Sequence, residues 1–226
     1  MSDEELQNAL MMLPKTFNKQ LLMSDEPNGT RGYRNNIMTV CINKEYEKVK
    51  SPQVGDVVID AGAYIGLFTG KSSLQVGDRG KVYAFEPEPE NFSHLRENTK
   101  GLKNVEIFNR ALWSSEKDLI LFVRQHHSSG HSLIDWVDAN KIKERLPVHT
   151  TYLDNVVKGK VDFIKLDAEG AELEILHGAT RILKQYKPFV VCEIHSKNLL
   201  HQIISFMLTY NYKHVGSDGI GVHAFW

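Results

Sequence analysis

The feature that most constrains the fold of this chain is the alternation of strand-like and helix-like segments from residue 54 onward. Short apolar runs typical of buried strands are mostly followed by segments whose apolar residues recur at helical spacing. Such an alternation predicts an α/β fold, in which helices cover both faces of a mostly parallel sheet. A final hairpin is expected to add an antiparallel strand at the C-terminus.

The same patterns give the boundaries of the expected elements. Strands are predicted at 37–42, 56–62, 81–87, 105–113, 118–124, 148–152, 161–167, 189–195, 213–216 and 221–226. Helices are predicted at 2–13, 66–74, 89–101, 134–145, 170–184 and 198–210, and polar loops at 24–32 and 125–132. We divide the chain into an N-terminal helix/strand extension, residues 1–50, that packs on the core, and a cofactor-binding domain, residues 51–226.

The composition narrows the class of protein. A chain of 226 residues has room for one substantial α/β domain. Its 27 basic and 28 acidic residues leave a formal charge of −1, which provides no electrostatic footprint for a nucleic acid. No apolar run approaches the length of about 18 residues that a membrane span needs, and the acidic N-terminus does not resemble a signal peptide. Cys41 and Cys192 are predicted to be buried free thiols. We therefore expect a cytoplasmic protein with no nucleic-acid and no membrane partner.

Four of the predicted strands carry an acidic residue at or near their carboxyl end. Asp60, Glu86, Asp167 and Glu193 each follow an apolar run. Because the carboxyl ends of parallel strands meet at one edge of a sheet, these side chains are expected to project at the same edge. Burial of an ionised carboxylate is costly unless the group is paired or hydrogen-bonded. The pattern therefore predicts a ligand site at this edge.

The first glycine-containing turn indicates which cofactor the site takes. In "DAGAYIG", Gly62 and Gly66 allow a tight turn and a close approach of the backbone to a ligand. Glu86 lies 20 residues after Gly66, where an acid can accept hydrogen bonds from both ribose hydroxyls. A carboxylate at Asp60 would repel the pyrophosphate of a dinucleotide but attract the cationic S-adenosylmethionine. We therefore predict S-adenosylmethionine rather than NAD, although a turn cap at Asp60 and a solvent-exposed strand end at Glu86 are the simpler alternatives.

Four blocks of the chain resemble the FkbM-type family of S-adenosylmethionine-dependent, class I methyltransferases. The blocks are "VGDVVIDAGAYIGLFT", "VYAFEPEPENFSHLRENT", "TTYLDNVV" and "VDFIKLDAEGAELEILHGA", and they occur in the order of the family between about Val54 and His195. The resemblance implies a Rossmann-like three-layer sandwich with a seven-stranded sheet of strand order 3-2-1-4-5-7-6. It also implies O-methylation of hydroxyls on sugars and natural products.

The resemblance also suggests the residues that hold the cofactor. Asp60, Gly62 and Glu86 would hold it, Arg110 and Ala111 would lie near the adenine together with Asn109, and Asp167 would lie under the methionine part. Tyr64 stands where the family commonly has asparagine. The full predicted cofactor site is Asp60, Gly62, Tyr64, Gly66, Glu86, Pro87, Arg110, Ala111 and Asp167.

The chemistry of methyl transfer to a hydroxyl requires alignment of the acceptor and removal of a proton. His195 and Glu169 are the candidate bases, and Asp167 faces the cationic half of the cofactor or the acceptor. A divalent ion on Asp167, Glu169 and Glu193 is an alternative means of activating the acceptor oxygen. The sequence does not distinguish base from metal, and we predict no metal ligand. The acidic residues that follow, Glu172 and Glu174, are expected to complement the dipole of their helix.

Residues outside the core motifs are predicted to contact the methyl acceptor. The candidates are His126, His127 and His131 of the polar loop and Tyr33 of the N-terminal extension. The predicted function is O-methylation of a hydroxyl on a small molecule, a sugar or natural product. The alternatives are a methyltransferase that acts on a protein and a catalytically silent cofactor-binding domain; an NAD-dependent oxidoreductase would instead bind a dinucleotide. The sequence makes no prediction about oligomeric state.

Overall fold

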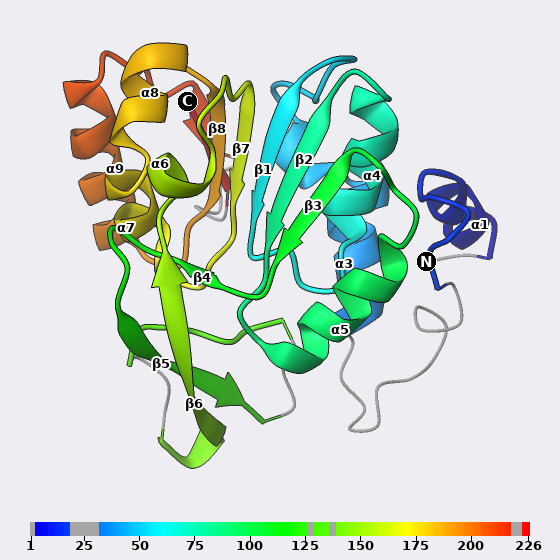
Figure 1. Ribbon diagram of the computed structural model, residues 1–226, viewed down its shortest axis with the longest axis horizontal. Coiled ribbons are helices and arrows are strands. Elements are labelled where there is room, and N and C mark those ends of the chain that lie inside the picture. The colour runs from blue at the N-terminus through cyan, green and yellow to red at the C-terminus, as the bar shows by residue number, and fades with distance from the viewer. Residues whose placement is uncertain (1–2, 19–31, 126–128, 136–138, 218–222) are drawn as a thin grey trace.

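The computed structural model describes residues 3–18, 32–125, 129–135, 139–217 and 223–226. The strands of its main sheet are β1 (Val57–Ala61), β2 (Lys81–Phe85), β3 (Val105–Phe108), β7 (Phe163–Leu166), β8 (Phe189–Glu193), β9 (Gly216–Ser217) and β10 (His223–Phe225). These seven strands are ordered β3-β2-β1-β7-β8-β10-β9 (Figure 1). The pairs from β3 to β8 are parallel, and β10 is antiparallel to both β8 and β9. The structure thus confirms the predicted Rossmann-like sheet, its strand order and its antiparallel C-terminal strand.

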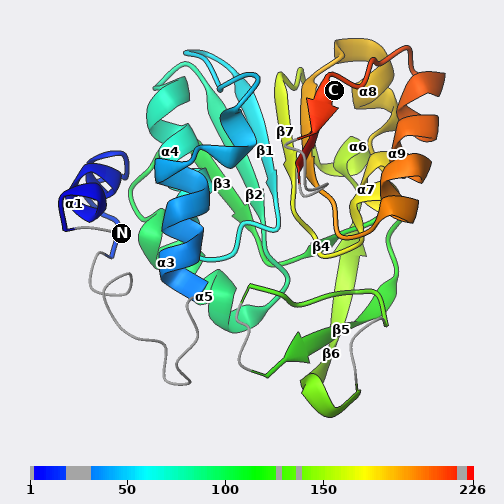
Figure 2. The ribbon, with the colours of Figure 1, turned by 180° about the vertical axis from the view of Figure 1, so that it is seen from behind.

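Successive residues of the central strands point to opposite faces, as the pleat requires. Val58 belongs to one buried cluster and Ile59 to the other, and the same holds for Phe163 and Ile164. The first face is covered by α3 (Gly32–Ile37), α4 (Leu67–Val76) and α5 (Pro89–Asn98), and α1 (Asp3–Met11) lies beside these helices at the side of the molecule. The second face is covered by α6 (Leu153–Val156), α7 (Glu172–His177), α8 (Thr180–Tyr186) and α9 (Lys197–Thr209) (Figures 1 and 2). The three layers of the predicted sandwich are therefore present.

A smaller sheet lies at the bottom of the molecule in Figures 1 and 2, below the main sheet. It has the order β4-β6-β5 and consists of β4 (Ala111–Leu112), β5 (Asp118–Arg124) and β6 (Ile142–Thr151). The predicted strand 105–113 is therefore two strands, since β3 and β4 belong to different sheets. The predicted helix 134–145 is wrong: residues 139–141 form a 3-10 turn, and β6 begins at Ile142 because its backbone pairs with β5. Residues 136–138 of that prediction lie outside the described residues.

The N-terminal extension contains a second wrong prediction. Residues 37–42 were expected to form a strand, but they complete α3 and continue as a π-helical segment, Met38–Ile42. Ile37, Val40 and Cys41 are buried at helical spacing against the face that carries α4. The β-branched residues of this run therefore serve a helix, because tertiary burial overrides the local propensity. Most of the predicted loop 24–32 lies outside the described residues.

Most other elements lie where they were predicted with shifted ends, although β6 begins well before the predicted strand 148–152 and β9 overlaps the predicted strand 213–216 only at Gly216. The predicted helix 170–184 is two helices, α7 and α8, which are separated near Gly178. A Cβ at Gly178 would lie 2.3 Å from the carbonyl oxygen of Trp113, so glycine is required there. Cys41 and Cys192 are buried and free, as predicted. None of the helices in the described ranges is long and apolar enough to span a bilayer. The domain boundary at residue 50 stays a prediction.

Candidate functional site

A cavity lies at the carboxyl ends of β1, β2 and β7. It encloses about 810 Å³, part of it open to solvent, and Gly62, Glu86 and Asp167 line it. The strands β2 and β3 lie on one side of β1, and the next strand of this sheet in the chain, β7, lies on the other side. This is the switch point, where ligands bind in open α/β sheets.

The loop after β1 forms one wall of the cavity. Gly62 has a φ of +74°, and a Cβ there would lie 1.8 Å from the carbonyl oxygen of Asp167. The backbone N–H groups of Gly62 and Ala63 donate to the carbonyl of Phe85 at 3.1 and 3.0 Å. Glycine at position 62 therefore lets the ends of β1 and β7 come into contact. Gly66 also has a positive φ, but it does not line the cavity, and its missing side chain makes room for Leu95 of α5.

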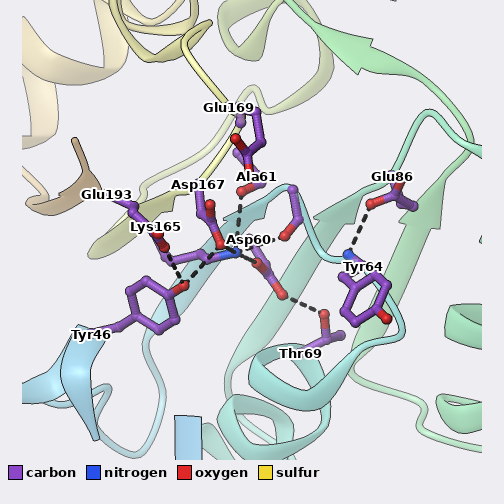
Figure 3. A network of polar contacts seen from close by, with 12 residues as sticks. Tyr46, Asp60, Ala61, Tyr64, Thr69, Glu86, Lys165, Asp167, Glu169 and Glu193 are labelled. Atoms are coloured by element: carbon purple, nitrogen blue, oxygen red, sulfur yellow. Dashed lines mark hydrogen bonds and ion pairs between the residues drawn. The ribbon is translucent and has the colours of Figure 1, made fainter. Parts of the chain in front are cut away.

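Glu86 faces the cavity just beyond the end of β2. Its carboxylate accepts hydrogen bonds from the backbone N–H groups of Tyr64 and Glu88, both at 2.9 Å (Figure 3). Burial raises the pKa of Glu86 to about 7, although the two N–H groups oppose this shift. Tyr64 has a φ of +53°, in the left-handed region where asparagine is more common, and its ring stacks on Tyr33 with centroids 6.1 Å apart. The two N–H groups thus hold the Glu86 carboxylate in place at the cavity wall.

Asp60 does not line the cavity. It is fully buried beneath it, accepts a hydrogen bond from the Thr69 hydroxyl of α4 at 2.6 Å, and lies 3.1 Å from the ammonium of Lys165 (Figure 3). Asp60 and Lys165 are register partners on β1 and β7. Lys165 lines the cavity in place of Asp60 and donates to the carbonyl of Gly62 at 2.7 Å. Burial opposes its charge, but Asp60 and Asp167 outweigh burial and raise the pKa of Lys165.

Asp167 and Glu193 share a phenol. The hydroxyl of Tyr46 lies 2.8 Å from Asp167 Oδ2 and 3.0 Å from Glu193 Oε2 (Figure 3). Burial acts to raise the pKa of Asp167, but Lys165 and His195 hold it below its usual range. Burial and repulsion by Asp167 raise the pKa of Glu193 to about 9. Because a hydroxyl has one proton to donate, the second contact at neutral pH uses the proton that Glu193 retains.

Glu169 and His195 approach each other at the side of the cavity. Glu169 lines the cavity, and its Oε2 lies 3.8 Å from His195 Nε2. Burial, followed by repulsion from Asp167 and Glu172, raises the pKa of Glu169 to about 8. Burial lowers the pKa of His195, so that its ring is neutral at neutral pH. Glu172 accepts from the backbone N–H groups of Ala168 and Gly170 at the start of α7, in keeping with its predicted helix-terminal role.

The remaining predicted residues differ in their distance from the cavity. Pro87, Arg110, Ala111 and His131 line it, and His131 Nδ1 accepts from the backbone N–H of Arg124 at 3.2 Å. Tyr33 does not line it but packs on Tyr64, which does. His195 does not line it, but its Nε2 lies 3.8 Å from Oε2 of Glu169, which does. His126 and His127 lie outside the described residues.

Residues 60–214 match the family model described as the methyltransferase FkbM domain, which is more than half of the chain. The chain belongs to the FkbM methyltransferase domain family. The match begins at Asp60, near the end of β1, and includes β2, β7 and β8, so the FkbM domain contains most of the residues described above.

Two relatives of this FkbM domain protein are informative. It is 32% identical over 146 residues to the hexuronic acid methyltransferase AglP of Haloferax volcanii, which covers 62% of this chain and 56% of AglP. Among solved structures, it is similar to the FkbM methyltransferase of Methylobacillus flagellatus, with a TM-score of 0.58 and 16% identity over 99% of this chain and 58% of that one. The second likeness shows the fold alone. The chain spans just over half the length of both proteins.

A metal ion has one candidate set of ligands among the described residues of this FkbM domain protein. Asp167, Glu193 and His195 offer ligand atoms within 4.8 Å of one another. The Lys165 ammonium, however, lies 3.5 Å from Asp167 Oδ2, where it would repel a cation. The hydroxyl of Tyr46 already bridges the two carboxyl groups. The donor set therefore fits a divalent cation poorly.

Lys165 and Tyr46 belong to the site but were not predicted from the sequence. Lys165 is a charged residue within the apolar run "VDFIKLD", and a lone cation in a buried parallel strand was a usable signal. Tyr46 comes from the 3-10 turn Glu45–Glu47, more than a hundred residues before its partners, and no local pattern marks it.

Proposed function

We propose that the protein is an S-adenosylmethionine-dependent methyltransferase that methylates a hydroxyl of a small polar molecule such as a sugar. The observation that carries this proposal is the convergence of Gly62, Glu86, Asp167 and Glu169 on one cavity. The family supports the methyl transfer, and the name of the Haloferax volcanii relative supports a sugar acceptor.

The residues of the cavity fit the proposed cofactor. Gly62 lines the cavity with its backbone, and a side chain there would clash with the carbonyl group of Asp167. Glu86 carries a carboxylate that can accept from ribose hydroxyls, while Arg110 and Ala111 lie where the adenine is expected. Asp167, with its low pKa, is an anion beside the expected methionine part. When bound, S-adenosylmethionine supplies a methyl group activated by a cationic sulfur.

Glu169 is the proposed general base. It lines the cavity, so its carboxylate can reach an acceptor hydroxyl, whereas His195 lies behind it. A pKa of about 8 leaves part of the Glu169 population ionised near neutral pH, and a cation bound nearby would favour the ionised form. His195 is a neutral neighbour of Glu169 at that pH, and because the pKa of His195 is lowered, the transferred proton stays on Glu169.

Calorimetric titration tests the cofactor assignment. S-adenosylhomocysteine should bind the wild-type protein, and NAD should not. Glu86→Ala should weaken the binding about 10- to 100-fold, since charge-assisted hydrogen bonds are lost. Glu106→Ala, which removes a half-exposed carboxylate from β3, is the matched control and should leave the affinity unchanged. Tight binding of NAD, or no binding of S-adenosylhomocysteine, would contradict the proposal.

The acceptor is tested by turnover. Hydroxylated acceptors, with neutral sugars and hexuronic acids compared, are incubated with S-adenosylmethionine, and production of S-adenosylhomocysteine is measured with and without a chelator. Turnover with one of these acceptors that is unaffected by chelation is expected. Binding of the cofactor without turnover on any acceptor would favour the catalytically silent alternative.

A further inference from the structure

Lys165 has a function that the methyl-transfer residues do not account for. Its side chain is only 4% exposed, yet the residue lines the cavity. Its ammonium contacts Gly62 O at 2.7 Å, Asp60 Oδ1 at 3.1 Å, Ala61 O at 3.4 Å and Asp167 Oδ2 at 3.5 Å. Asp60 is fully buried and does not line the cavity. The strands thus bring a charged ammonium to the cavity surface and compensate its charge from below.

The other buried lysine of the described chain shows that such a pair does not need a cavity. Lys71 of α4 forms an ion pair with Glu47 and donates to the carbonyl of Val40 at 2.8 Å. Neither Lys71 nor Glu47 lines the cavity. Lys71 joins the N-terminal extension to α4, whereas Lys165 faces the space in which a ligand would lie.

The proposed cofactor has a charge that the site must neutralise. Besides its cationic sulfur, S-adenosylmethionine carries an ammonium and a carboxylate on one carbon. Burial of that carboxylate without a partner would be costly. Among the described residues that line the cavity, Lys165 and Arg110 carry a permanent positive charge, and Arg110 is exposed beyond β3. Lys165 is therefore the buried cation beside the Gly62 loop.

We propose that Lys165 and Asp167 together bind the zwitterionic head of the methionine part, with Lys165 on its carboxylate and Asp167 on its ammonium. This proposal rests on the proposed function. An α-amino acid presents opposite charges a few ångström apart, and the Lys165 ammonium and the Asp167 carboxylate lie 3.5 Å apart on the same strand end. Lys165 is thus a binding residue for the part of the cofactor that takes no part in the chemistry.

A comparison of two ligands tests the assignment. S-adenosylhomocysteine and its decarboxylated analogue differ in the carboxylate alone, and calorimetry measures the affinity of each. The wild-type protein should prefer S-adenosylhomocysteine about 10- to 100-fold. In the double variants D60N/K165M and D60N/K165Q, which remove the buried pair together, the preference should fall to within about three-fold. Circular dichroism identifies which of the two is folded.

The experiment has a matched control, and its contrary outcomes separate the role of Lys165 from the proposed function. The variant E47Q/K71M removes the other buried lysine–glutamate pair and should keep the wild-type preference. Equal affinity of the wild-type protein for both ligands, or an undiminished preference in a folded D60N/K165M or D60N/K165Q variant, would overturn the role of Lys165 and leave the proposed function intact. No binding of either ligand by the wild-type protein would overturn both proposals.

Discussion

Two groups of acids lie at the same edge of the sheet and differ in how their charge is compensated. Asp60 and Asp167 lie within 3.1 and 3.5 Å of the Lys165 ammonium, and the pKa of Asp167 is low. Among the described residues no lysine forms an ion pair with Glu169 or Glu193, and their pKa values are raised to about 8 and 9. A buried carboxylate keeps its charge beside an ammonium and otherwise keeps a proton. One lysine therefore divides the edge into an anionic part and a proton-holding part.

Replacement of Lys165 should abolish this difference between the two parts. It should also have a large effect on stability. Lys165→Met leaves Asp60 buried without a counter-charge, which should lower the free energy of unfolding by about 3–5 kcal/mol in urea denaturation. The double variant D60N/K165M should recover most of this loss, because no buried charge remains uncompensated. A loss as large in D60N/K165M as in Lys165→Met would show that the ammonium matters for packing rather than for charge.

Changing an acid of the proton-holding part should affect turnover instead. Glu169→Gln should lower kcat about a hundred-fold, equivalent to about 2.7 kcal/mol in activation free energy, because it removes the proposed base. Affinity for S-adenosylhomocysteine should change little. In the wild-type protein, kcat should rise with pH at or below the pKa of about 8 that Glu169 has without ligand, and this rise should be absent from the variant. Glu174→Gln, in the helix that follows the turn carrying Glu169 but bonded to Ser114 outside the cavity, is the control and should retain wild-type kcat.

The phenol that joins the two parts should have an intermediate effect. Tyr46→Phe removes the hydroxyl that contacts Asp167 and Glu193, which should cost about 1.5–2 kcal/mol of unfolding free energy. Tyr186→Phe, which removes a hydroxyl from α8, should cost less than about 0.5 kcal/mol. Equal stability losses in the two variants, measured by urea denaturation, would mean that the bridge is not a stabilising contact.

The pH dependence of stability tests the protons retained by the buried glutamates. Glu86, Glu169, Glu172 and Glu193 have folded-state pKa values of about 7, 8, 7 and 9, against 4.5 in the unfolded chain. The folded protein thus binds more protons, so its stability falls as pH rises through these values. His195 has the opposite effect only below its ordinary value of 6.5. Between pH 6.5 and 9, Tm should fall by at least about 3 °C, and a constant or rising Tm would contradict the assignment of retained protons.

The sequence predicted those parts of the site that depend on local patterns. The apolar runs and the glycine turn place Gly62, Glu86 and Asp167 at strand ends, and the structure brings all three to one cavity. Asp60 shows the limit of this reasoning, because a strand position does not reveal that a lysine on the next strand will cover it. The same limit applies to Tyr46, whose partners are 121 and 147 residues away.

The prediction of the fold has the same limit as the prediction of the site. The main sheet was predictable because burial on both faces produces continuous apolar runs in the parallel strands. The predictions for residues 37–42 and 134–145 were wrong because the secondary structure of each segment is decided by partners elsewhere in the chain. The first packs beside α4, and most of the second pairs with β5 or lies outside the described residues.

The long-range position of Tyr46 has a consequence for the order in which this protein acquires its site during synthesis. The phenol leaves the ribosome early, while the two carboxyl groups that it contacts follow 121 and 147 residues later. Contacts of such separation form late, since loop closure must precede them. The nascent chain therefore gains this part of the cavity only after β8 has emerged, and a ligand that needs it favours the completed domain over every shorter chain.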